Sequence, residues 1–284
     1  MSVTTTGTPY ENANFDWNGG SFSRTDVTIP SGATTAFIGF GWYHTSTVSI
    51  SAVTLDGQSA TQVLNEDNGS GTNSGAVWRV SGFSSGASKT LAATIGGTNY
   101  GPDISIVFVS GEDTSTPVSS SVASSTSDTG LTATSGALTA ATGDLFLSFF
   151  TADNSYTTTY GSGQTEIAGP VSGGNAVELT VSSEAATNGD TQTGTGDYIT
   201  GLFLVVAQAT GGALTASGTP SSDIITASGV ASFRHSASGT PSSDIITASG
   251  TAGILSSVTI TDVNTTESWD DGDTGLVITG TGFV

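Results

Sequence analysis

The stretch "TAFIGFGWYH", residues 35–44, alternates large apolar side chains between the two faces of an extended chain. Phe37 and Tyr43 fall on one face and Phe40 and Trp42 on the other, because successive side chains of a β-strand point to opposite sides. A strand that is apolar on both faces is typical of the centre of a sheet that is covered on each side. We therefore expect residues 35–44 to form a central strand of an all-β fold.

Similar runs recur through the first 210 residues and are separated by Gly, Pro, Asn and Asp, which is the pattern of short antiparallel strands joined by turns. The sequence predicts an antiparallel β-sandwich or jelly-roll-like domain of two sheets over residues 1–210. In the run at 75–83, alternation places Trp78 and Val80 in the core and Arg79 in solvent. The further predicted strands cover residues 23–30, 48–57, 59–67, 75–83, 89–97, 103–112, 129–140, 144–153, 176–185 and 198–210.

Charge and composition exclude several classes of protein. The chain has 24 acidic residues against four Lys and Arg, a net charge of −20, so it lacks the basic clusters that bind nucleic acid. It contains no Cys, which rules out disulfides, zinc-thiolate sites and thiol nucleophiles. No stretch has the length of apolar sequence that crosses a membrane, and the first twenty residues show no secretory signal, so we expect neither a membrane association nor export by that route.

The segment "ASGTPSSDIITASG" occupies residues 216–229 and recurs letter for letter at 237–250. It lies in a Gly/Ser/Thr-rich region, 211–254, in which we expect a turn at Gly-Thr-Pro and a short strand at Asp-Ile-Ile-Thr in each copy. A single chain offers little apolar surface here, so we predict a homotrimeric stalk, with a monomeric linker as the alternative. The predicted contacts between chains are Ile224, Ile225, Ile245 and Ile246.

The last region, residues 255–284, reads as two strands joined by the acidic loop "WDDGDTG". Asp270, Asp271 and Asp273 offer carboxylate oxygens for a Ca²⁺ ion, the one cofactor that the sequence suggests. The alternative is a solvated hairpin loop held by Asx turns.

Two parts of the chain resemble known modules. The order of "TIPSGATTAFIGFGWY", "VTLDGQSATQV", "GAVWRVSGF", "IVFVSGEDTSTPV" and "TGDLFLSFF" resembles a β-sandwich module of bacteriophage structural proteins and bacterial surface proteins. The string "LVITGTGF" at 276–283 is similar to the start of an immunoglobulin-like IPT/TIG module. This implies at 255–284 either a partial module of a longer parent chain, which we favour, or a module cut down to an Ig-like hairpin.

Candidate catalytic groups do not assemble into a recognisable set. The string "GFSSG" at 82–86 matches a nucleophile elbow, yet no helix is predicted after it, so we interpret Ser84 as a loop serine. Trp17, Tyr156 and Tyr160 stand outside clear core alternation and are candidate glycan contacts, the alternative being edge packing. We expect the protein not to be an enzyme.

These observations favour a structural protein on the surface of a bacteriophage virion, with capsid decoration or a head fibre favoured over a tail fibre. Its expected partners are other virion proteins, and a host-surface glycan is a further candidate. The alternative is a carbohydrate-binding adhesin of a phage tail or a bacterial surface. The sequence leaves open the capsid or tail location, the receptor and the oligomeric state.

Overall fold

The computed structural model describes two compact units, residues 2–209 and residues 210–284. Every helix or strand assigned among the described residues is a β-strand, which confirms the all-β prediction. In the first unit the described residues are 2–12, 20–44, 49–67, 72–96, 99–126, 129–153, 158–171 and 178–209, and in the second they are 214–216, 224–228, 233–235 and 245–249.

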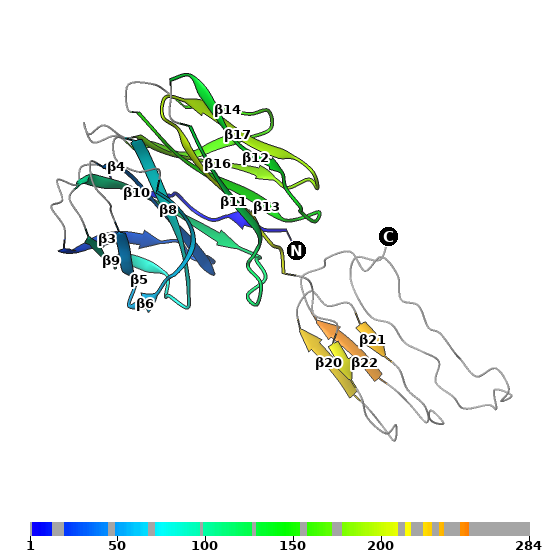
Figure 1. Ribbon diagram of the computed structural model, residues 1–284. Helices are drawn as coiled ribbons and strands as arrows, with labels where there is room; N and C mark the ends of the chain where they lie inside the picture. The colour runs from blue at the N-terminus through cyan, green and yellow to red at the C-terminus, as the bar shows by residue number, and fades with distance from the viewer. Residues whose placement is uncertain are drawn as a thin grey trace, which may run out of the picture. The chain divides into compact units, whose positions relative to one another are not determined.

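The first half of the larger unit is a sandwich of two antiparallel sheets, here called sheets I and II (Figure 1). Sheet I has the order β3 (Gly20–Ile29), β9 (Gly86–Gly96), β5 (Ser49–Leu55) and β6 (Gln58–Ser59). Sheet II has the order β1 (Thr4–Thr5), β10 (Asn99–Ser110), β4 (Thr35–His44), β8 (Thr72–Ser81) and β7 (Thr61–Glu66), and β2 (Tyr10–Asn12) also pairs with β10.

The second half is another sandwich, made of sheets III and IV. Sheet III has the order β11 (Val118–Ser125), β18 (Thr200–Val206), β13 (Leu145–Ala152), β16 (Glu178–Ala185) and β15 (Thr165–Val171). Sheet IV has the order β12 (Leu131–Ala137), β17 (Thr191–Gly196) and β14 (Thr159–Tyr160).

Three apolar cores hold these sheets in a stack of four layers. Trp42, Trp78 and Phe108 lie in the core between sheets I and II. Sheets II and III share a second core, with Phe37 and Val77 on one side and Phe149 and Leu202 on the other. The third core lies between sheets III and IV and contains Phe146, Phe150 and Phe203. The expected two-sheet sandwich is therefore two sandwiches packed face to face, because sheets II and III are apolar on both faces.

The second sandwich repeats the topology of the first. The order β10-β4-β8-β7 in sheet II matches β18-β13-β16-β15 in sheet III, and β3-β9-β5 in sheet I matches β12-β17-β14 in sheet IV. The registers match as well: Thr35 pairs with Ser81 and Val109, as Leu145 pairs with Ala185 and Val206. Each position of β4 and β8 near these pairs thus has a counterpart in β13 and β16.

Strand β8 shows what this stacking does to single side chains. Trp78 and Val80 are buried against sheet I, as predicted. The prediction that Arg79 faces solvent is wrong: Arg79 shares its face with Val77, which sheet III covers, and its side chain is half-buried. Burial lowers the pKa of Arg79, and the negative charge of Glu112 opposes that shift.

Both ends of the chain segment 2–209 lie at one end of the stack, called here the proximal end. Val3 N donates to Gly143 O at 2.9 Å, and Ala209 N donates to Gly111 O at 2.8 Å. The other end, called the distal end, is where β4 finishes at His44 and β18 begins at Thr200. There Thr200 Oγ1 donates to Asn73 O at 2.9 Å, between sheets III and II.

The second unit pairs its repeats in parallel. Strand β20 (Ile224–Ser228) pairs with β22 (Ile245–Ser249), and β19 (Leu214–Ala216) pairs with β21 (Phe233–His235). The predicted short strand of each copy is therefore present, and its two copies are register partners within one chain. Parallel strands lie about 4.8 Å apart, so the second copy widens the sheet by that distance and does not extend the chain lengthwise.

Candidate functional site

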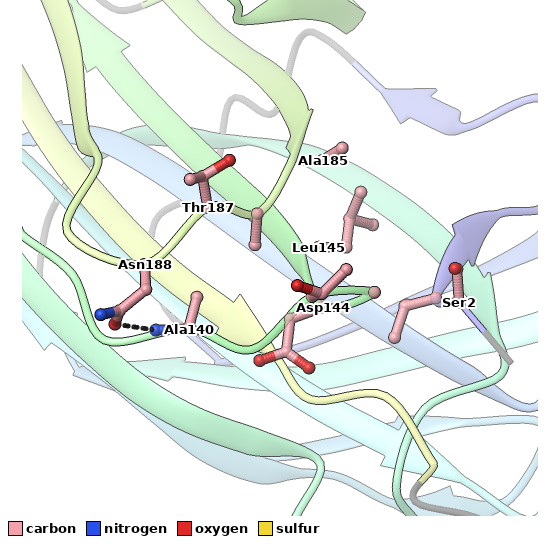
Figure 2. A pocket seen from close by; sticks show the side chains of 11 residues that line it. Ser2, Ala140, Asp144, Leu145, Ala185, Thr187 and Asn188 are labelled. Carbon is pink, nitrogen blue, oxygen red and sulfur yellow. Dashed lines mark hydrogen bonds between the residues drawn. The ribbon is translucent and has the colours of Figure 1, made fainter.

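An open depression of about 620 Å³ lies at the proximal end of the second sandwich (Figure 2). Its lining comes from the N-terminal residues, the turn before β13 and the turn after β16. The lining residues are Ser2, Val3, Ala140, Thr142, Gly143, Asp144, Leu145, Ala185, Ala186, Thr187 and Asn188.

The one ionisable side chain in this depression already has a structural task. Asp144 is 5% exposed, and its two carboxylate oxygens accept hydrogen bonds from Ala141 N and Gln208 N, each at 2.8 Å. Asn188 Oδ1 likewise accepts from Ala140 N at 3.1 Å. The Asp144 contacts fix the turn 141–144 and the segment after β18, and the Asn188 contact fixes Ala140. The one carboxylate of this depression is therefore already engaged by backbone amides.

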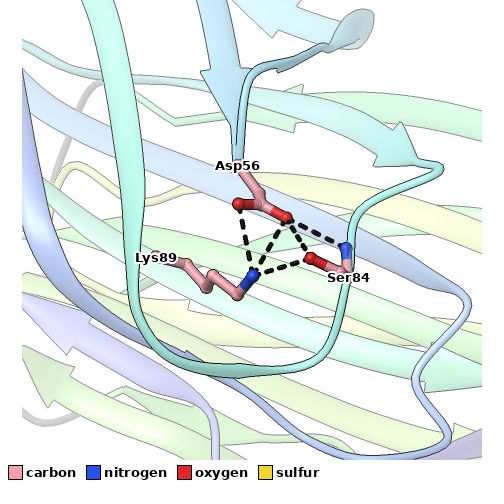
Figure 3. Close-up of polar contacts among 3 residues, drawn as sticks. All are labelled: Asp56, Ser84 and Lys89. Carbon is pink, nitrogen blue, oxygen red and sulfur yellow. Dashed lines mark hydrogen bonds and ion pairs between the residues drawn. The ribbon is translucent and has the colours of Figure 1, made fainter.

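A second polar group joins two turns and strand β9 at the edge of the first sandwich (Figure 3). Asp56 Oδ2 accepts from Ser84 N at 3.0 Å and from Ser84 Oγ at 2.8 Å. Lys89 Nζ lies 3.3 Å from the same carboxylate oxygen and donates to Ser84 Oγ at 2.7 Å. Asp56 and Gly57 both have positive φ between the paired residues Leu55 and Gln58, which is the type I′ hairpin turn that Asp-Gly favours.

This Asp56–Ser84–Lys89 cluster resembles a serine-lysine pair but lacks its chemistry. A lysine that acts as a general base must accept the serine proton, whereas Lys89 Nζ donates to Ser84 Oγ and forms an ion pair with Asp56. The hydrogen bonds from the Ser84 backbone and hydroxyl, with a smaller contribution from Lys89, lower the pKa of Asp56, so the acid stays ionised. The turn that holds Ser84 leads into strand β9 and not into a helix, which agrees with the interpretation of Ser84 as a loop serine.

The structure describes one of the three predicted glycan contacts. Tyr160 packs against Phe150, with ring centroids 5.8 Å apart, and its hydroxyl donates to Glu166 Oε2 at 3.1 Å. These contacts fit the alternative of edge packing. Trp17 and Tyr156 lie outside the described residues, as do Asp270, Asp271 and Asp273 of the predicted calcium loop.

Two further features are absent from the described residues. They contain no group of three or more His, Cys, Asp or Glu side chains placed to hold a metal ion. They also include no helix with the length and apolar character needed to span a bilayer.

Comparisons with protein-family models, with curated proteins and with solved structures gave no match. The resemblances to a phage sandwich module and to an IPT/TIG module therefore rest on the quoted sequence strings.

Proposed function

We propose that the protein is a non-enzymatic structural protein of a bacteriophage particle surface, with capsid decoration or a head fibre favoured over a tail fibre. The observation that supports this most is the position of the chain ends. Residues 2–3 and 207–209 lie together at the proximal end, so the distal end of the four-layer stack holds neither end of the segment 2–209. In this proposal the distal end is the part that contacts the particle.

The rest of the structure supports a structural role over a chemical one. The clusters at Asp144 and at Asp56 consist of acids already engaged by backbone amides, a hydroxyl or a lysine. The partners in this proposal are other virion proteins and, as the sequence predicts, two further copies of the chain.

Electron microscopy of labelled particles tests the proposal. Particles from a phage lysate that contains this chain are labelled with an antibody against residues 2–209 and, separately, with gold on a tag placed after Val284. We expect both labels on the capsid, with the gold farther from the capsid wall than the antibody. Labels on the tail would favour a tail fibre, and purified particles without either label would contradict the proposal.

A carbohydrate-binding adhesin is the second candidate, and the places where three described strands begin or end favour it. β2 ends at Asn12, β3 begins at Gly20 and β13 ends at Ala152, all toward the distal end, and the predicted glycan contacts Trp17 and Tyr156 follow or precede these strands in the sequence. A glycan array with the full chain and with Trp17→Ala and Tyr156→Ala variants tests it. Binding of a defined glycan that both variants lose supports the adhesin, and an array without any bound glycan contradicts it.

A further inference from the structure

The repeated topology shows a change of chemistry at the centre of the second sandwich. In the first sandwich Ile38, Trp78 and Val80 face sheet I and are buried apolar residues. Their counterparts Ser148, Ser182 and Glu184 face sheet IV at the same register positions. Ala76 likewise corresponds to Thr180. Polar side chains thus replace the apolar core on one patch of sheet III.

Neighbouring side chains build a hydrogen-bonded network over this patch. Gln192 Nε2 donates to Glu184 Oε2 at 2.9 Å, and Gln164 Nε2 donates to Ser182 Oγ at 2.9 Å. Glu166 is the register partner of Ser182, and Tyr160 donates to its Oε2. We call these residues, together with Ser148 and Thr180, the sheet III polar patch.

Two acidic residues lie on neighbouring strands of this patch. Glu184 is two residues beyond Ser182 on the same face of β16, and Glu166 pairs with Ser182 from β15, so the two acids are diagonal neighbours. Diagonal neighbours lie about 7 to 8 Å apart between Cα atoms, within reach of long side chains. The chain bulges between Glu166 and Ala168, a feature that commonly re-aims a side chain. In each acid Oε2 accepts the hydrogen bond, and among the described residues no hydrogen bond reaches Oε1.

A buried oxygen atom beside the carboxylates lacks a partner. Gln192 is 1% exposed, and its Oε1 has no hydrogen-bond partner among the described residues. Its amide nitrogen is bound to Glu184, so this oxygen lies next to the carboxylate. The hydroxyls of Ser148 and Thr180, 0% and 2% exposed, also lack partners among the described residues. Because buried polar atoms nearly always have a partner, the Gln192 oxygen beside the Glu184 carboxylate indicates a place for a ligand.

The charge of the patch favours a cation as its ligand. The lysines and arginines of residues 2–209 are Arg24, Arg79 and Lys89, and all three belong to strands of the first sandwich, so sheets III and IV offer no basic side chain to balance the two carboxylates. We propose that the sheet III polar patch binds a divalent cation of the calcium type through Glu166, Glu184 and Gln192 Oε1. Carboxylate, amide and hydroxyl oxygens are the ligands that Ca²⁺ takes, in a geometry flexible enough for side chains from three strands.

Thermal unfolding and terbium luminescence of the full chain test this site. We expect CaCl₂ to raise the melting temperature relative to the same sample in EDTA. Tb³⁺, which occupies calcium sites, is expected to emit on tyrosine excitation because Tyr160 bonds to Glu166, and Ca²⁺ is expected to displace it. Glu166 is exposed, so Glu166→Gln is expected to fold normally and to weaken Ca²⁺ binding by at least about tenfold, as is Glu184→Gln.

Two controls separate this site from other acidic groups. Asp26→Asn removes one charge from the first sandwich, and Asp270→Asn, Asp271→Asn and Asp273→Asn together remove the predicted calcium loop. Both controls are expected to keep the calcium-dependent shift. The proposal is overturned if Ca²⁺ leaves the melting temperature of the wild-type chain unchanged, or if Glu166→Gln and Glu184→Gln bind Ca²⁺ as tightly as the wild type.

Discussion

The ring of Phe149 in β13 lies directly over Gly39 in β4, so a Cβ atom at position 39 would overlap the ring. Gly39 is in the middle of an apolar strand, where glycine is otherwise unfavourable. It is tolerated because the absent side chain leaves room for Phe149 from the facing sheet. Thr151 fits against Gly41 in the same way. The two sandwiches therefore pack as closely as they do because glycine occupies the centre of sheet II.

Substitution of Gly39 tests this close approach. Gly39→Ala is expected to lower the free energy of unfolding by about 1 to 3 kcal/mol, because an overpacked core must shift side chains or backbone. Urea unfolding followed by tryptophan fluorescence measures the effect. Gly196→Ala is the matched control, since a Cβ there meets Ala152 Cβ at an ordinary 3.4 Å. Phe149→Leu in the Gly39→Ala background is expected to restore part of the loss, and equal effects of the two glycine substitutions would contradict the argument.

The Asp56–Ser84–Lys89 cluster predicts a dependence of stability on acidity. Hydrogen bonds from Ser84 lower the pKa of Asp56 in the folded state below its ordinary value. The cluster is therefore expected to stabilise the fold fully at a pH above the ordinary aspartate pKa. This stabilisation is expected to be lost as the pH falls through the lowered pKa of Asp56. Asp56→Asn keeps the left-handed turn, because Asn tolerates positive φ, and is expected to reduce the acid-induced fall in the urea midpoint. An unchanged pH profile in Asp56→Asn would assign the acid sensitivity to other carboxylates.

The environment of Tyr10 predicts a loss of stability at alkaline pH. Burial, followed by the hydrogen bond to Asp26 at 2.9 Å, raises the pKa of Tyr10 to about 12 from 10.0. Stability is expected to be complete below pH 10 and to fall as the pH rises toward 12, because the unfolded chain loses this proton first. In Tyr10→Phe the alkaline loss is expected to be smaller. A phenolate absorbance titration gives the pKa directly, and a value near 10 for Tyr10 would contradict the prediction.

Sequence patterns predicted most strands of the first sandwich but missed β11, β15 and β17 of the second, and they did not predict the layers. Alternation in residues 35–44 shows that both faces of the strand are covered, but it does not say that sheet I covers one and sheet III the other. The internal repetition of topology was also hidden, because counterparts such as Trp78 and Ser182 share no chemistry. The strands of the two sandwiches pair in the same register, but the side chains at matching positions differ. A single sequence therefore carries no signal of the repetition.

The candidate sites were harder still to predict. Asp56 lies in one turn, Ser84 in another and Lys89 in strand β9, and Glu166, Glu184 and Gln192 come from three strands, so no local spacing links either set. The Asp-Gly dipeptide at 56–57 was a usable signal for the hairpin turn, though not for its partners.

The parallel register of the repeats gives a direct test of how the second unit is built. Thr226 and Thr247 are register partners in β20 and β22, and the chain has no native Cys to compete. Parallel partners lie about 4.8 Å apart, within the Cα range of about 4.4 to 6.8 Å that a disulfide spans. We expect a Thr226→Cys, Thr247→Cys variant to form a disulfide within one chain on mild oxidation, which non-reducing electrophoresis detects as a faster monomer band. The pair Thr226→Cys, Ser249→Cys is two residues out of register and is expected to oxidise much more slowly. If the in-register pair instead gives mainly cross-linked dimers or trimers, the repeats pair between chains, as the predicted isoleucine seam of a homotrimer requires.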